Sequence, residues 1–396
     1  MSYDFSRSAS RKTTNAEKYV LKEQLFGTDN LLPMWVADMD IDTPDFVIKA
    51  VQKRLEIPNF GYEEFPMSAK KAQIEWMKRH HGITFIEDDL LYSHSVVASM
   101  NAVIEAFTKE GEGVIVQTPV YPPFFKSVLQ QNRKLIINPL KKELNGDYCF
   151  DFDDLCSKID ENTKLLLLCS PHNPVGRVWK KEELEQLAQI CLEHKIIVFS
   201  DEIHSDLVYE PNKHIPFASL NDTIKNITIT ALGVGKTFNM ASFAISTVAI
   251  PNKVLREQFK KVYDTIHFAQ GTALGHVGFE SAYMQGDVWL SELKKHLQKN
   301  IAILEEVCKK HHDKISFKAP QGTYLAWLDC SRTGLDSKAL REFFVQKAKL
   351  GLSPGIAFSK DAGNYMRLNF AVSSDIMHQA MQQLDNALQG LNHGTN

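Results

Sequence analysis

The chain has 396 residues, of which 44% are hydrophobic and 23% are charged, and its formal net charge is −3. Such values predict a soluble globular protein with room for two domains, and they exclude a basic surface made for nucleic acid. No apolar run reaches about 18 residues, so we expect no membrane-spanning helix, and the N-terminus lacks the apolar core of a secretory signal. Six scattered cysteines without a C-x-x-C pair predict reduced thiols and a cytoplasmic location.

The N-terminal half of the chain predicts an arm followed by an α/β domain. The first 45 residues are rich in turn formers, and we expect them to pack on a small domain as an arm. From about residue 90 to 250, short apolar runs without alternation are separated by helical periods, which is typical of buried parallel strands in a doubly wound sheet. The predicted strands lie at 114–116, 135–137, 165–169, 196–199 and 227–229.

After residue 285 the pattern changes to that of a smaller α+β domain. A long helical stretch at 288–312 precedes two strand-like segments, a helix at 336–349, a strand at 365–370 and a last helix. The apolar stripe of that last helix contains Met377, Ala380, Met381, Leu384 and Leu388. We therefore expect an arm at 1–45, a large domain at 46–285 and a small domain at 286–396.

The segment ITALGVGKTFNM at 229–240 resembles the end of a nucleotide-binding P-loop. A P-loop requires a glycine at position 230, where the chain has Thr230, and a helix directly after the lysine. The residues at 243–251 read instead as a strand. Lys236 is therefore not expected to bind a nucleotide phosphate.

Polar residues follow three of the predicted strands, namely Asn173, then Asp201 and His204, then Lys236. Each has an ordinary explanation alone, because Asn-Pro often forms a turn, an aspartate often caps a helix, and a loop lysine is usually solvated. In an open α/β sheet, however, these strand ends meet at the ligand-binding edge. Together they are the set that pyridoxal phosphate (PLP) requires: an amine for a Schiff base and a carboxylate for the pyridine nitrogen.

Longer motifs make the chain resemble the fold-type I PLP-dependent enzymes of aminotransferase class I/II. Within them it is most similar to cystathionine β-lyases of the MalY/PatB type. The resemblance covers nearly the whole chain and implies a mostly parallel seven-stranded sheet, PLP as cofactor, an amino-acid substrate, and a homodimer with shared active sites. The motifs are LPMWVADMD (32–40), FGY (60–62), QTPVYPPF (117–124), LLLLCSPHNPVGRVW (165–179), SDEIHSDLVY (200–209), KTFN (236–239), GTYLAWLD (322–329) and RLNFA (367–371).

The resemblance also implies a role for each residue around the cofactor ring. Lys236 is expected to form the Schiff base and to move the proton at Cα, and Asp201 to pair with the pyridine nitrogen. Asn173 and His204 are expected at the phenolate oxygen, where many relatives have a tyrosine in place of the histidine. Tyr121 is expected to cover the ring, so that Lys236, Asp201 and Tyr121 form the catalytic set.

Further residues are implied at the substrate and at the subunit interface. Arg367 is expected to bind the substrate α-carboxylate with its planar fork, close to Asn173. The segment WVAD is expected to close over the substrate, with Trp35 and Asp38 as contacts. Tyr62 is expected to reach the phosphate of the neighbouring subunit.

Three departures from the family's pattern cluster near the expected phosphate site. The backbone of Val96 and Val97 is expected to hold the phosphate at a helix N-terminus. Ser95 stands where relatives have glycine, and a positive φ at this position would strain it. Gly235 stands where relatives have a serine that often binds the phosphate, and Ser242 also replaces a glycine. We expect weaker cofactor binding with intact chemistry, and the Ser95 hydroxyl is one candidate to replace the lost contact.

The activity that the resemblance implies is β-elimination, which cleaves cystathionine or a related cysteine S-conjugate to a thiol, pyruvate and ammonia. Two alternatives stay open: an aminotransferase that uses the same residues, and a regulatory or binding protein on the same fold. No metal site is expected, because the paired histidines at 80–81 and 311–312 lie late in helical segments, where they need no metal.

Overall fold

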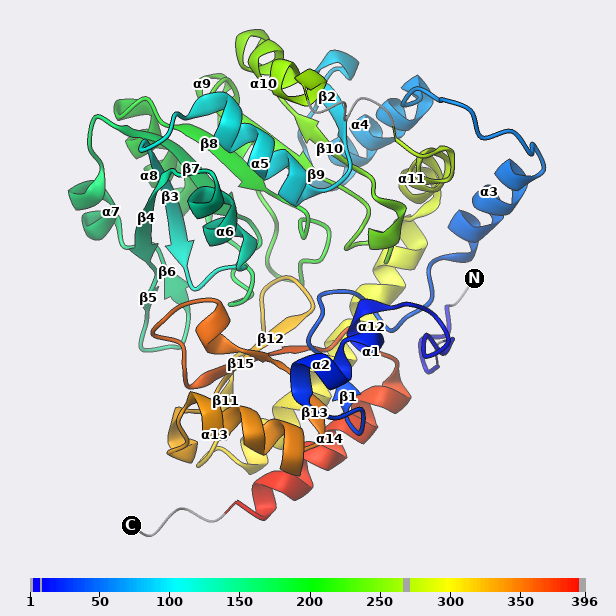
Figure 1. The fold of residues 1–396 in the computed structure, drawn as a ribbon, viewed down its shortest axis with the longest axis vertical. Helices are drawn as coiled ribbons and strands as arrows, with labels where there is room; N and C mark the ends of the chain where they lie inside the picture. Colours follow the sequence, from blue (N-terminus) through cyan, green and yellow to red (C-terminus); the bar gives the residue numbers. More distant parts are fainter. Residues whose placement is uncertain (1–2, 8, 266–270, 392–396) are drawn as a thin grey trace.

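A seven-stranded sheet forms the centre of the larger part of the molecule (Figure 1). The computed structural model describes residues 3–7, 9–265 and 271–391. The strand order is β2-β10-β9-β8-β7-β3-β4, and only β10 runs antiparallel to its neighbours. The predicted fold class is thus confirmed. The strands are β2 (Leu90–Ser93), β3 (Gly113–Thr118), β4 (Lys134–Pro139), β7 (Thr163–Cys169), β8 (Ile197–Asp201), β9 (Thr228–Leu232) and β10 (Ser246–Ala249).

Helices cover both faces of this sheet. Within β3, Val114 and Val116 belong to one apolar cluster and Ile115 to another, because successive side chains of a strand point to opposite faces. Burial on both faces explains why the strands read as unbroken apolar runs. Side chains of α5 (Val96–Phe107), α6 (Pro123–Gln130) and α10 (Lys253–Thr265) belong to the first cluster. Side chains of α7 (Phe152–Lys158), α8 (Lys181–Glu193) and α9 (Asp222–Lys225) belong to the second. The helices α3 (Asp45–Leu55), α4 (Met67–His81) and α11 (Ala273–Gln285) pack together beside β2 and β10.

The C-terminal part is built around an antiparallel sheet in the order β11-β12-β15-β14. The apolar stripe predicted for the last helix is buried in full. The helix predicted at 336–349 is shorter, because α13 ends at Glu342 and a π-helical turn follows before Lys349 at φ 53°. The elements are α12 (Asp287–Lys310), β11 (Ser316–Phe317), β12 (Leu325–Asp329), α13 (Ser337–Glu342), η5 (Phe343–Lys347), β14 (Ser353–Pro354), β15 (Tyr365–Asn369) and α14 (Ser374–Gln389).

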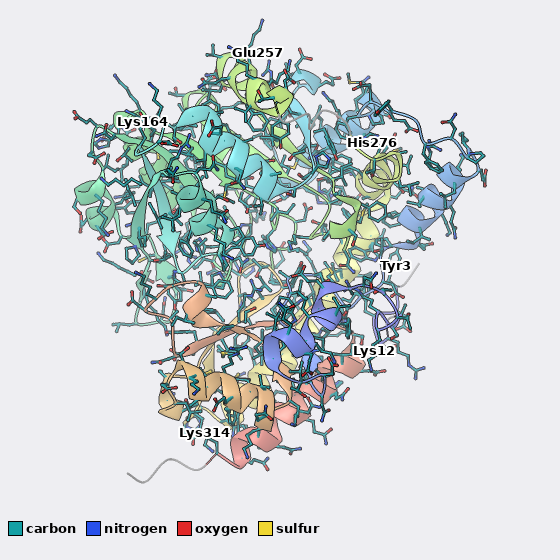
Figure 2. All side chains as sticks on the ribbon, viewed as in Figure 1. Tyr3, Lys12, Lys164, Glu257, His276 and Lys314 are labelled. Carbon is teal, nitrogen blue, oxygen red and sulfur yellow. The ribbon has the colours of Figure 1, made fainter. Side chains whose placement is uncertain are left out.

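The N-terminal arm lies against the C-terminal part, as Figure 1 shows for its blue segment beside orange and red elements. Its strand β1 (Leu32–Pro33) pairs in parallel with β13 (Leu350–Gly351). The helices α1 (Glu17–Val20) and α2 (Lys22–Phe26) precede β1. Figure 2 shows the side chains on the same ribbon, with Tyr3 and Lys12 labelled in the N-terminal segment. The domain boundaries at 45/46 and 285/286 stay a prediction.

The remaining elements are short. None of the helices among the described residues has the length and apolar character needed to cross a lipid bilayer. The short elements are η1 (Glu87–Asp89), β5 (Lys141–Lys142), β6 (Tyr148–Cys149), η2 (Phe217–Ser219), η3 (Ala241–Phe243), η4 (Ser331–Thr333) and η6 (Gly355–Ala357).

Candidate active site

A cavity of about 210 Å³ lies at the carboxyl ends of β7, β8 and β9. Open α/β sheets bind ligands at this edge, because the loops that follow parallel strands all emerge there. The sequence-predicted residues that line the cavity are Ser95, Val96, Val97, Tyr121, Asn173, Asp201, His204, Gly235 and Lys236. Segments far apart in the sequence thus meet at one place, as the strand-end argument predicts.

Lys236 follows β9 in a tight turn and reaches the segment 35–38 of the N-terminal arm. Its Nζ donates a hydrogen bond of 2.6 Å to the carbonyl oxygen of Ala37, which also accepts from the Tyr324 hydroxyl at 2.8 Å. Burial, together with the nearby charge of Arg367, lowers the pKa of Lys236 to about 8. Part of this amine is therefore neutral near physiological pH, as a nucleophile or a proton acceptor must be.

Asp201 is the last residue of β8 and its side chain is buried at the cavity. Its Oδ1 accepts a hydrogen bond of 3.2 Å from the backbone of Ile203. Burial raises the pKa of Asp201 to about 6, more than the hydrogen bond and the charge of Lys236 lower it. A carboxylate held in such a place gains from a cationic partner, which a protonated ring nitrogen would supply.

His204 lines the same cavity from the loop after β8. Burial, together with the charges of Lys236 and Arg367, lowers the pKa of His204 far below its usual range, so the ring is neutral. Its Nδ1 is buried without a hydrogen-bond partner. Since buried polar atoms of proteins are nearly always hydrogen-bonded, this nitrogen points to a polar ligand in the cavity.

The N-terminus of α5 borders the cavity and is capped by Ser95. The Ser95 backbone is extended, with φ −163°, and its Oγ accepts a hydrogen bond of 3.1 Å from the amide of Ala98. The strain considered for a positive φ is therefore absent, and the serine is a favourable helix cap. The first amides of a helix have no partner within the helix, so those of Val96 and Val97 suit an anion such as a phosphate.

The other two departures from the family's pattern differ in their position. Gly235 lines the cavity, and a Cβ atom there would touch only the backbone of Ala241, at 3.6 and 3.8 Å. Ser242 lies in η3, is exposed, and is not among the residues that line the cavity. Ser242 thus does not line the cavity, although its neighbour Ala241 does, and its place near the phosphate stays a prediction.

Arg367 extends the site from β15 of the C-terminal sheet. Its guanidinium donates to Asn173 Oδ1 at 3.1 Å and to the carbonyl oxygen of Trp35 at 2.6 Å. The group lies 4.8 Å from the centre of the Phe358 ring, and its Nε is buried without a partner. A buried, planar cation with an unused donor beside the cavity is suited to a carboxylate.

The arm contributes its backbone to the site more than its side chains. Trp35 and Asp38 do not line the cavity, whereas Ala37 does. The Asp38 carboxylate lies 2.8 Å from both Lys18 and Arg11, in an ion cluster of the arm. The substrate contacts predicted for Trp35 and Asp38 stay a hypothesis, and the structure places the Asp38 side chain in a network that holds the segment 35–38.

Tyr62 lies outside the cavity in the connection between α3 and α4. Its side chain is 95% exposed, and it makes no part of the site within this chain. Tyr121, by contrast, lines the cavity, and burial raises the pKa of its hydroxyl. The structure thus brings together the predicted ring-contacting residues and leaves Tyr62 available for contact with another molecule.

The model of the family described as aminotransferase class I and II matches residues 30–384 of the chain. The chain belongs to this family. The relative "Cystathionine beta-lyase PatB" of Bacillus subtilis (strain 168) is 36% identical over 97% of this chain and 100% of its own length. The structure of cystalysin from Treponema denticola, which contains pyridoxal 5'-phosphate, has a TM-score of 0.95 at 35% identity, covering 99% of this chain and 100% of that one. The PLP-bound C–S lyase from Staphylococcus hominis has a TM-score of 0.90 at 33% identity, with 98% of both chains covered.

Two contacts at this aminotransferase-family site are not predicted from the sequence. Ala37 takes part through its carbonyl oxygen, which no sequence pattern marks. Tyr324 lies in the GTYLAWLD motif, directly before β12, and its hydroxyl reaches the same oxygen. Only the motif around Tyr324 gave a signal that could have identified it.

Proposed function

We propose that the protein is a PLP-dependent carbon–sulfur β-lyase that acts on cystathionine or a related cysteine S-conjugate. The reaction consumes one water and yields a thiol, pyruvate and ammonia. The observation that carries the proposal is the arrangement of Lys236 and Asp201 in one buried cavity with Arg367 adjoining it. The names of PatB and of the Staphylococcus hominis C–S lyase support the lyase over other reactions of the family.

The chemistry of the cavity fits PLP, a flat ring with an aldehyde, a basic nitrogen and a phosphate. Nδ1 of His204 is buried without a hydrogen-bond partner, and burial raises the pKa of Asp201, so a polar ligand with a cationic ring nitrogen would satisfy the first and stabilise the charge of the second. The helix N-terminus at Ser95 offers amides for a dianion. The residues proposed to hold the cofactor are Lys236 at the aldehyde, Asp201 at the ring nitrogen, Asn173 and His204 at the phenolate oxygen, Tyr121 over the ring, and Ser95, Val96, Val97 and Gly235 at the phosphate.

When bound, PLP supplies an electron sink for the charge that develops at Cα of the amino acid. Arg367 binds the α-carboxylate and, with Asn173, fixes the orientation of Cα. Nζ of Lys236 takes the proton from Cα, for which its pKa of about 8 is well matched to neutral conditions. The Cβ–sulfur bond then breaks with its electron pair on sulfur, which takes a proton, for which the protonated Nζ of Lys236 is a source, and leaves as the thiol. Water converts the remaining three-carbon fragment to pyruvate and ammonia.

Product analysis of the purified, PLP-loaded protein tests this function. With L-cystathionine, we expect equal amounts of pyruvate and free thiol, and with 2-oxoglutarate we expect no glutamate. Glutamate without pyruvate would support the aminotransferase instead. A protein that is colourless after unbound PLP is removed, without an absorbance band at about 420 nm, would support a binding role.

We also propose a homodimer in which Tyr62 contacts the phosphate of the partner's cofactor. The exposed apolar residues around it support this, since Ile57 is 62% and Phe60 is 55% exposed in a single chain. Mixed dimers of Tyr62→Ala and Lys236→Ala subunits would contain one intact site. Recovered activity on mixing, from two nearly inactive variants, is the expected result, and no recovery would contradict shared sites.

We further propose that the protein works in the cytoplasm. All six cysteines have free thiols, and Cys169, Cys191, Cys308 and Cys330 are buried. Such thiols fit a reducing compartment. Fractionation of cells that express the native chain would place it, and a periplasmic or secreted fraction would contradict the proposal.

A further inference from the structure

A buried carboxylate contacts the residue that follows Lys236. Oδ2 of Asp206 accepts a hydrogen bond of 2.8 Å from the hydroxyl of Thr237. Its Oδ1 accepts from Nε1 of Trp76 at 2.9 Å and pairs with Nε2 of His81 at 2.7 Å. The Asp206 side chain is only 5% exposed, and Asp206 is not among the residues that line the cavity.

These three partners keep Asp206 ionised. Burial by itself raises the pKa of this carboxyl, but the hydrogen bonds from His81, Trp76 and Thr237 lower it to about 2. An ionised carboxylate only accepts hydrogen bonds, so Nε2 of His81 carries the proton in this pair. A buried charge is tolerated when it is paired and its lone pairs are filled, as they are here.

A second carboxylate–imidazole pair faces the first. The His81 ring meets the ring of His214 edge to face at 5.4 Å, and Nε2 of His214 lies 2.8 Å from Glu202. Glu202 also accepts from the hydroxyl of Ser200 at 2.8 Å and from the amide of Phe217 at 2.9 Å. Glu202 follows Asp201 in the chain, as Thr237 follows Lys236. One pair thus contains Glu202, the residue after Asp201, and the other pair contacts Thr237, the residue after Lys236.

The turn that holds Lys236 is fixed at several points. Its backbone closes through a hydrogen bond of 2.9 Å from Phe238 to Val234. The Asn239 side chain accepts from the amide of Met39 at 3.1 Å and donates to carbonyl oxygens of the arm. Between these points, the hydroxyl of Thr237 is tied to Asp206. A charged group outside the cavity is therefore hydrogen-bonded to the residue next to Lys236.

We propose that Asp206, with His81 as its hydrogen-bond partner, is a positioning residue for Lys236. It fixes Thr237, and through Thr237 it fixes the backbone from which the Lys236 amine reaches the cofactor and Cα. A displacement of about 1 Å at a reacting group can reduce a rate roughly 100-fold, so a fixed turn has catalytic value. This inference rests on the proposed function, because it assumes that Lys236 holds PLP.

The alternative is that this network only stabilises the fold, and three variants separate the two roles. Thr237→Val removes the hydroxyl with little change of shape. The hydrogen bonds of His81 and Trp76 with Asp206 are kept. Thr237→Ser keeps a hydroxyl and should rescue the function. Thr247→Val is the matched control, because Thr247 is fully buried in β10 and exchanges hydrogen bonds of 2.7 and 3.0 Å with Gln73, outside the cavity.

The experiment compares these holoenzymes by kcat and KM for L-cystathionine, by the PLP dissociation constant, by the pH midpoint of the visible absorbance band and by Tm. For Thr237→Val we expect kcat to fall roughly 10- to 100-fold with KM little changed. We also expect weaker PLP binding and a shifted absorbance midpoint. Thr237→Ser should stay close to wild type. Thr247→Val should lower Tm without moving the absorbance midpoint.

Distinct results would overturn the inference and the proposed function. If wild type binds PLP but Thr237→Val keeps its kcat, PLP affinity and absorbance midpoint, Asp206 does not position Lys236. Equal effects in Thr237→Val and Thr247→Val would also reject the inference, as a purely structural role predicts. If Thr237→Val does not fold, Thr237→Ala, which is smaller than threonine, serves in the same comparison. A wild-type protein without bound PLP would reject the proposed function itself.

Discussion

The two sides of the cavity are built in different ways. On one side, side chains from strand ends of the large sheet supply the reactive groups, such as Asp201 and Lys236. On the other side, the arm supplies carbonyl oxygens, with Ala37 accepting from Lys236 and Trp35 accepting from Arg367. The chemistry of a side chain is visible in the sequence, whereas every residue has a carbonyl. The first side could therefore be predicted residue by residue and the second could not.

The arm side also shows how a residue can serve the site from outside it. Asp38 is turned to Lys18, whose side chain is completely buried, and to Arg11. This ion cluster holds the segment 35–38, whose carbonyl oxygens meet both cations of the site. Asp38 thus contributes through the backbone that it anchors, much as we propose for Asp206 on the other side.

Removal of the amine on the strand side has the largest expected effect. In Lys236→Ala, we expect no visible absorbance band of an internal imine, no covalent cofactor label after borohydride reduction, and a loss of kcat of at least about 1,000-fold. Among the described residues that line the cavity, Lys236 is the one lysine, so no other side chain there offers a primary amine. Spectra, peptide mapping of the reduced wild type and pyruvate assays measure the effect. Lyase turnover and colour that both survive would remove the basis of the proposal.

Replacement of Arg367 tests the side of the cavity that adjoins the arm. Arg367→Lys keeps the charge and loses the planar fork, so the contacts to Asn173 and Trp35 cannot all form. A lost hydrogen bond to a charged group corresponds to roughly 1.5–3 kcal/mol, or about 10- to 100-fold in KM. Steady-state kinetics with cystathionine measures it. A fall in kcat at constant KM would show that the residue acts at the reacting bonds instead of at the carboxylate.

The sequence predicted most of the strand side because strands and their polar ends are local features. Local sequence is enough to predict the apolar runs, the motif around Asp201 and the apolar stripe of α14, because none of them depends on a contact with a distant segment. The strands β1, β13 and β14 have two residues each and exist through pairing with remote segments, so the pattern gave no sign of them. The backbone angle at Ser95 is likewise a property of the folded helix start, and only the structure shows that the serine is an unstrained cap.

The buried carboxylate at position 201 should reduce the stability of the cofactor-free protein. The pKa of Asp201 is about 6 in the folded protein and 3.8 for an ordinary aspartate, so the folded state binds the proton more tightly than the unfolded state. The free energy of unfolding then falls as the pH rises from about 4 to about 6 and stays lower above that, by roughly 3 kcal/mol at most. Asp201→Asn removes this dependence, and urea unfolding at pH 4 and pH 7 measures it. A variant less stable than wild type at pH 7 would show that Asp201 already has a favourable partner.

The smallest expected effect concerns the phosphate end of the strand side, at Gly235. A serine there has room, because a Cβ would meet only Ala241 at 3.6 and 3.8 Å and the position has no positive φ. Its hydroxyl would add one hydrogen bond to the phosphate, or roughly 0.5–1.5 kcal/mol, which corresponds to about 2- to 10-fold tighter PLP binding. Gly235→Ala is the matched control, since its Cβ has the same room beside Ala241 and carries no hydroxyl. Equilibrium dialysis of PLP against both variants measures the difference. Unchanged affinity in Gly235→Ser would place the phosphate away from this glycine, nearer to the cap of α5.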